Sequence, residues 1–164
     1  GAIRRGFSFA LSKDDPMPVL YSLPDFLSGV VTREQYVRWL HRKAQAHVIR
    51  DRKRVTWPVT VSAYKTAIHA AVVASGGLDH YTGEPLNWAQ ISTYDNAASK
   101  AGRSAYRAGF ALLPSVDHVS GDGDGYDFVI CGWRTNDSKH DMSLADFVAL
   151  CRRVVARHGH LSPA

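Results

Sequence analysis

The chain has little cysteine and no long hydrophobic run. Its two cysteines, Cys131 and Cys151, are too few for a disulfide framework or for a zinc site built on Cys-x-x-Cys pairs. Each lies in a segment of apolar periodicity, so we expect both thiols to be buried. No apolar stretch is long enough to cross a bilayer, and no signal segment is recognised. We therefore expect a cytoplasmic protein in a reducing setting, without a membrane partner.

The composition is that of an ordinary globular protein. Of 164 residues, 45% are hydrophobic, 21% charged and 10% aromatic, which predicts one domain, with room for a small helical subdomain. The formal net charge is +5. Much of this charge lies between Arg33 and Arg54, a pattern typical of a surface that binds a polyanion such as nucleic acid.

Local patterns divide the chain into three segments. We expect residues 1–30, with scattered proline and glycine, to be mostly irregular, residues 31–77 to form a basic helical region, and residues 78–160 to form the functional core. The helical region starts strongly, because Thr32 and Gln35 have the spacing of a capping box. This first helix is expected to reach about Arg54.

The first helix has an apolar and a basic side. Its apolar stripe comprises Val37, Leu40, Ala44 and Val48, with Trp39 and His47 beside it. The opposite face carries the candidate nucleic-acid-binding residues, which are Arg38, Arg42, Lys43, Arg50 and Arg52. We interpret them as phosphate contacts, with a merely solvated face as the alternative.

A second helix is predicted over residues 62–75, ended by Gly76. Its apolar stripe is expected to consist of alanines, with larger side chains alongside. Further on, two strands are predicted over residues 110–119 and 126–134, joined by a Gly/Asp-rich turn. A short helix near Asn136, capped by Thr135, follows them. The last helix starts at Ser143 and is expected to turn its apolar side chains inward, namely Leu144, Phe147, Val148, Cys151, Val154 and Val155.

The candidate catalytic residues lie at the end of the first strand and the start of the short helix. His118 is the candidate general base, since a neutral imidazole accepts a proton from water near physiological pH. Asp117 lies on the other side of an extended chain or is turned by a kink. Its carboxylate and the Asn136 amide oxygen can hold a hard divalent cation. His140 follows Asn136 by four residues and is a further candidate ligand if both lie on one helical face.

This order of residues resembles the HNH nuclease family, whose motif is a strand–strand–helix unit around a metal. The resemblance covers roughly residues 78–155, with its centre at 113–141. It implies that Asp117 binds the metal, that His118 activates water, and that Asn136, in the pattern Asn-x-x-Lys, is a metal ligand. Lys139 would then support the loop or approach a phosphate.

The chain departs from the family pattern in two respects. The middle position is often Asn, whereas here it is Asp127, which can accept hydrogen bonds that hold the His-bearing loop but cannot donate them. Many relatives carry a structural zinc on Cys-x-x-Cys pairs, and none is expected here. Packing must hold the core instead, and five aromatic residues are available: Trp88, Phe110, Phe128, Trp133 and Phe147. Asn136 and His140 compete for the last ligand position, and Asn136 is preferred.

Several other patterns have ordinary explanations. The Asp122-x-Asp124 pair lacks the other ligands of a calcium loop and is interpreted as a solvated turn. Asp79-His80 repeats the Asp-His pair without a matching downstream Asn and is not expected to bind a metal. Three further histidines, His41, His47 and His69, are interpreted as surface or packing residues.

The sequence thus predicts an α+β protein with a ββα-metal core, an N-terminal basic helical region and a C-terminal helix. The expected activity is hydrolysis of DNA phosphodiesters with one Mg²⁺ or Mn²⁺ ion, and RNA is the alternative substrate. Two other functions stay open. One is non-catalytic DNA binding on a decayed HNH core. The other is a nuclease effector that needs a protein partner; a homodimer is also considered.

Overall fold

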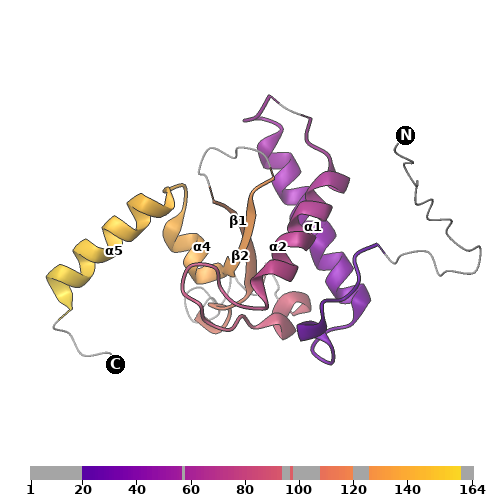
Figure 1. Ribbon diagram of the computed structural model, residues 1–164, viewed down its shortest axis with the longest axis horizontal. Helices are drawn as coiled ribbons and strands as arrows, with labels where there is room; N and C mark the ends of the chain where they lie inside the picture. Colours follow the sequence, from indigo (N-terminus) through magenta and orange to yellow (C-terminus); the bar gives the residue numbers. More distant parts are fainter. Residues whose placement is uncertain (1–19, 57, 94–96, 98–107, 120–125, 160–164) are drawn as a thin grey trace, which may run out of the picture.

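The computed structural model describes residues 20–56, 58–93, 97, 108–119 and 126–159. Within these residues the chain is an α+β protein with one antiparallel pair of strands (Figure 1). The elements in chain order are η1 (Asp25–Leu27), α1 (Arg33–Asp51), α2 (Val61–Ser75), η2 (Trp88–Ser92), β1 (Pro114–His118), β2 (Phe128–Gly132), α4 (Trp133–Lys139) and α5 (Leu144–His158).

Helix α1 begins where its capping box predicts. The Thr32 hydroxyl accepts a hydrogen bond from the Gln35 amide at 3.2 Å, and the Gln35 side chain accepts one from the Thr32 amide at 2.8 Å. The helix ends at Asp51, three residues before the expected end. Its buried side includes the expected Leu40, Ala44 and Val48, whereas Val37 is half-buried.

Helix α2 has the predicted bounds to within one residue, but a different side is buried. Gly76, with φ +56°, adopts the left-handed conformation that ends many helices. The buried residues are Tyr64, Ile68 and Val72, whereas Ala70 is exposed. The expected alanine stripe is therefore wrong. Larger side chains remove more apolar area from water, so they take the core-facing side.

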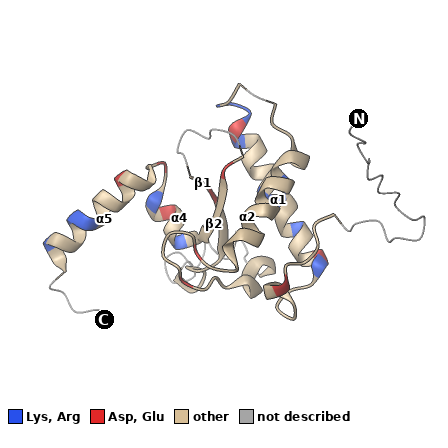
Figure 2. Cartoon of the chain, in the orientation of Figure 1, with Lys and Arg blue, Asp and Glu red and all other residues tan. Residues whose placement is uncertain are grey.

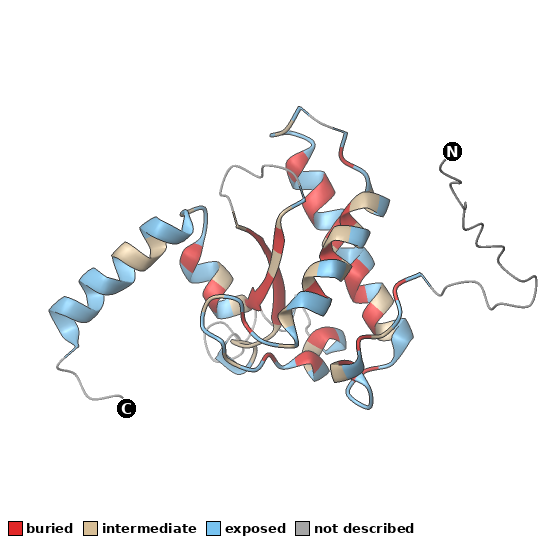
Figure 3. Ribbon diagram, viewed as in Figure 1, coloured by how far each residue is buried: buried red, intermediate tan, exposed pale blue. Residues whose placement is uncertain are grey.

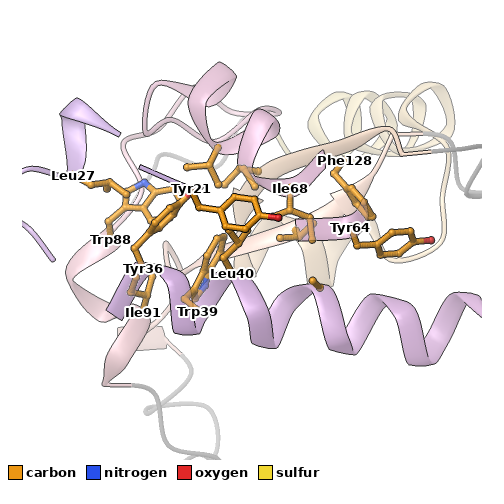
Figure 4. Close-up of a cluster of buried hydrophobic side chains, with 14 of the residues drawn as sticks. Tyr21, Leu27, Tyr36, Trp39, Leu40, Tyr64, Ile68, Trp88, Ile91 and Phe128 are labelled. Carbon is orange, nitrogen blue, oxygen red and sulfur yellow. The ribbon is translucent and has the colours of Figure 1, made fainter. Parts of the chain in front are cut away.

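The hydrophobic core lies where α1, α2, η2 and the strands meet (Figures 3 and 4). The aromatic rings pack edge to face, with the Trp39 and Trp88 centroids 5.3 Å apart and the Tyr64 and Phe128 centroids 5.0 Å apart. Of the five aromatic residues expected in the core, Trp88 and Phe128 are buried. The other three are half-buried, namely Phe110, Trp133 and Phe147.

The two predicted strands pair, and both are shorter than expected. His118 of β1 lies opposite Phe128 of β2, and Pro114 lies opposite Gly132. The connection between the strands, with Asp122 and Asp124, lies outside the described residues. Helix α4 follows β2 directly, with Gly132 as its N-cap. Thr135 is therefore not the cap but a buried residue within the helix.

Helix α5 starts after the Ser143 cap as predicted, but it extends away from the rest of the molecule (Figure 1). None of its residues is buried, and Val154 and Val155 are exposed. The expected inward-facing stripe is wrong. Cys131 is buried as expected, whereas Cys151 on α5 is exposed. In the part of the chain that the structure describes, no helix combines the length and apolar character needed to span a membrane.

Candidate functional site

Strand β1 places Asp117 and His118 on its two faces, as the alternation of side chains along a strand requires. The Asp117 carboxylate faces α4, where Lys139 Nζ lies 3.0 Å from its Oδ2 atom. The His118 ring faces α1, where Asp51 Oδ2 lies 3.0 Å from Nε2. Both residues are buried. The candidate site therefore has two polar sides, separated by the strand.

Two carboxylates contact the His118 ring. Asp51 lies at Nε2, and Asp127 Oδ1 lies 3.3 Å from Nδ1. The Asp51 side chain is 6% exposed, whereas that of Asp127 is 35% exposed. Phe128 packs on the same ring, with centroids 4.5 Å apart. His118 is thus held in one orientation, with a closed side toward Asp51 and a more open side toward Asp127.

Asp51 is itself held by two further donors. The Tyr64 hydroxyl donates to its Oδ2 at 3.0 Å, and Arg50 Nε donates to its Oδ1 at 2.9 Å. Burial by itself would raise the pKa of the Asp51 carboxyl. The hydrogen bonds from Arg50 and His118 outweigh burial, so the pKa lies below its usual value. Asp51 is therefore a carboxylate at neutral pH.

His47 completes a buried polar cluster with Asp51 and His118. Its ring centroid lies 5.4 Å from that of His118, and its Nδ1 lies 2.7 Å from Arg50 Nη2. Burial, with the nearby Arg50 charge, lowers the pKa of His47 to about 3, so its imidazole is neutral. Each of the three residues offers one ligand atom within 4.8 Å of the other two, and this group can hold a metal ion.

The sequence patterns did not single out this cluster. They gave Asp51 no role, and His47 was interpreted as a surface or packing residue. The only local signal is the spacing of four residues between His47 and Asp51, which places both on one side of α1. Their proximity to His118 depends on how α1 packs against the strands.

The other side of β1 is formed by Asp117, Tyr81 and Lys139. The Tyr81 hydroxyl donates to Asp117 Oδ2 at 2.8 Å, beside the Lys139 ammonium. Burial, reinforced by the Asp117 charge, raises the pKa of the Tyr81 phenol. Lys139 is only 1% exposed. It supports the Asp117 side chain and, buried as it is, does not offer its ammonium to a phosphate.

Asn136 lies on the same side of β1 as Asp117. Its Nδ2 donates to Ser115 Oγ at 2.9 Å. Ser115 lies two residues before Asp117, so both side chains are on the same face of β1.

The position of His140 differs from the expectation. Helix α4 ends at Lys139, and His140 has φ +51° with a side chain that is 78% exposed, next to Asp141. It therefore does not share a helical face with Asn136, which removes the argument for His140 as a ligand.

Asp79 has a structural role. Its Oδ2 accepts hydrogen bonds from the Gly132 amide at 2.7 Å and the Thr135 hydroxyl at 2.8 Å. Its Oδ1 accepts from the amides of Tyr81 and Thr82. The carboxylate thereby ties the loop that carries Tyr81 to the junction of β2 and α4. Its neighbour His80 is exposed.

The basic residues of α1, blue in Figure 2, differ in their surroundings. Arg38 and Arg42 line a surface hollow of about 490 Å³, together with Lys65 of α2. Arg50 is exposed, but its guanidinium contacts the buried His47 and Asp51. Lys43 is half-buried near the Trp39 ring, and burial lowers its pKa to about 8. Arg52, just beyond the helix, is exposed. Arg38 and Arg42, four residues apart, lie on one side of the helix, whereas Lys43 and Arg50 lie roughly 80–100° further around it.

A comparison with protein-family models found no match, and comparisons with curated proteins and with solved structures found none either. The function is therefore inferred from the geometry of the described residues.

Proposed function

We propose that this protein is a divalent-metal-dependent endonuclease of the HNH type that hydrolyses DNA phosphodiesters. One observation carries the proposal. Strand β1 ends in Asp117 and His118, and the helix that follows its partner strand brings Asn136 and Lys139 against the Asp117 side. An imidazole, a carboxylate and an amide around one strand end are the groups that such hydrolysis uses.

His118 acts as the general base, and Asp51 determines which nitrogen accepts the proton. Asp51 is ionised, so it accepts a hydrogen bond from Nε2–H and favours the tautomer with the lone pair on Nδ1. Nδ1 is on the more open side, next to Asp127. Rotation of the partly exposed Asp127 side chain admits water to Nδ1, which takes the proton as the water attacks phosphorus.

Asp117 and Asn136 are the residues that would hold a Mg²⁺ or Mn²⁺ ion. Both offer oxygen, the donor that these cations prefer. The Asn136 Nδ2 atom is engaged by Ser115, so the side chain offers its Oδ1. The ion supplies charge neutralisation on the phosphoryl and leaving oxygens. Because Lys139 already offsets the Asp117 charge, we expect weaker binding of the ion than at an unpaired carboxylate.

The exposed cations support a polyanionic substrate. Arg38 and Arg42 at the hollow and Arg52 beyond α1 can contact phosphates without reading sequence. RNA is the second candidate substrate. A binding protein without activity and an effector that needs a protein partner are the other outcomes of the experiment below.

The first experiment is plasmid cleavage by the isolated protein at neutral pH. Nicked or linear DNA is expected with Mg²⁺ or Mn²⁺ and not with EDTA. Cleavage that persists in EDTA contradicts the proposal. Salt-sensitive DNA binding without cleavage points to a binding protein. Cleavage only after addition of cell extract points to a partner-dependent effector. Cleavage of RNA but not of DNA identifies RNA as the substrate.

Asp51→Asn tests the positioning of His118. The amide keeps the shape of the side chain but can donate to Nε2, which favours the wrong tautomer. We expect cleavage to fall about 10–100-fold, the usual cost of losing an orienting partner, and its pH profile to shift. Asp141→Asn, at an exposed carboxylate, is the matched control. An unchanged rate and pH profile in Asp51→Asn contradicts the orienting role.

A further inference from the structure

We propose that His47, Asp51 and His118 form a Zn²⁺ site, and that zinc bound there withdraws His118 from catalysis. The site is distinct from the Asp117–Asn136 position on the other side of β1. The binding half of the inference depends only on the cluster itself. The inhibitory half rests on the proposed nuclease function.

The geometry is close to that of a zinc centre. The three ligand atoms lie within 4.8 Å of one another, and ligands of a tetrahedral zinc ion at about 2.1 Å lie about 3.4 Å apart. Small side-chain movements are enough to close this difference. Two ligands come from successive turns of α1 and the third from β1, and three protein ligands leave a fourth position for water.

The donor chemistry favours zinc over the ions expected at Asp117. Imidazole nitrogen suits Zn²⁺, whereas Mg²⁺ prefers oxygen. Two donors already have the required protonation state, since His47 is neutral and Asp51 is ionised. Only His118 must change, because its Nε2–H faces Asp51. Zinc binding at Nε2 therefore moves the single ring proton to Nδ1, with no net release to solvent.

The same exchange explains inhibition. A neutral imidazole carries a single N–H, so a metal on Nε2 of His118 leaves the proton on Nδ1. That nitrogen can no longer accept a proton from water. It can instead donate to Asp127 Oδ1, 3.3 Å away. A carboxylate on the far nitrogen is the usual partner of a zinc-bound histidine. With a proton on Nε2, His118 is active as a base. With zinc on Nε2 it is inactive, and the two states exclude each other.

Arg50 opposes zinc. It donates to His47 Nδ1 and to Asp51 Oδ1, and its positive charge lies beside the cluster. The Arg50 side chain is 42% exposed, so it can turn into solvent when the metal enters. Removing this competitor is expected to tighten zinc binding.

The test is calorimetric titration of the chelator-treated protein with ZnCl₂. We expect one ion per chain and no net release of protons. His47→Phe, which keeps an aromatic ring beside Phe128, should weaken binding at least 10-fold. His41→Phe, at an exposed position on the same helix, should not. Arg50→Met should strengthen binding, which keeps the test decisive if His47→Phe fails to fold.

Equal affinities of the wild type, His47→Phe and Arg50→Met would overturn the site. In the plasmid assay with Mg²⁺, zinc should inhibit the wild type and not His47→Phe. Zinc that binds at this cluster without inhibiting an active nuclease overturns the inhibitory half alone. If no nuclease activity exists, the titration still decides whether the site binds zinc, so the two failures are distinguishable.

Discussion

Replacing His118 with alanine is expected to lower plasmid cleavage by about 10²–10⁴-fold, the usual contribution of a general base. The substitution removes the imidazole between Asp51 and Asp127, and with it the proposed proton acceptor. Asp51 keeps its hydrogen bonds from Arg50 and Tyr64, so the fold should persist. Initial rates of nicking with Mg²⁺ or Mn²⁺ measure the effect.

Two further variants make this result specific. His80→Ala removes an exposed histidine near the same strands and should cleave like the wild type. His118→Gln fills more of the space and replaces the alanine variant if that one unfolds. A folded His118 variant with wild-type rates removes His118 from the role of base and leaves the proposed mechanism without its proton acceptor.

Replacing Lys139 with methionine is expected to lower the free energy of unfolding by about 3–5 kcal/mol, the usual effect of breaking a buried ion pair by removing one partner. Lys139 is only 1% exposed, and its Nζ lies 3.0 Å from Asp117 Oδ2. Methionine fills a similar volume but leaves the Asp117 charge buried with only the Tyr81 hydroxyl at that oxygen. Urea unfolding at neutral pH measures the loss.

The double variant Lys139→Met with Asp117→Asn separates the charge effect from packing. It removes both charges, so most of the lost stability should return. Lys53→Met, at an exposed lysine, should change stability little. If Lys139→Met is as stable as the wild type, the ion pair does not hold α4 against β1, and another contact must position Asn136.

Local signals predicted the elements well. The Thr32 capping box marked the start of α1, Gly76 the end of α2, and Ser143 the start of α5. Such signals act through hydrogen bonds and backbone conformation within a few residues. They can therefore be recognised from the local sequence, without knowledge of the rest of the fold. The placement of Asp117 and His118 on opposite faces of β1 follows from strand geometry in the same way.

Predictions that needed a partner surface were less reliable. Apolar periodicity correctly indicated that α5 is amphipathic, but it wrongly placed that side in the core. In α2 it selected alanines where the larger Tyr64 and Ile68 are buried. Periodicity describes one helix, whereas burial depends on what packs against it. The HNH resemblance stays a hypothesis that the proposed experiments test.

The sequence by itself determined the α+β class, the capped helices and the position of Asp117 and His118 at the end of a strand. Only the tertiary structure decided that His47 and Asp51 of α1 meet His118, and that Lys139 is buried against Asp117. The physical reason is distance along the chain. Asp51 and His118 are 67 residues apart, and no local propensity specifies a contact that only the packing of α1 against the strands creates.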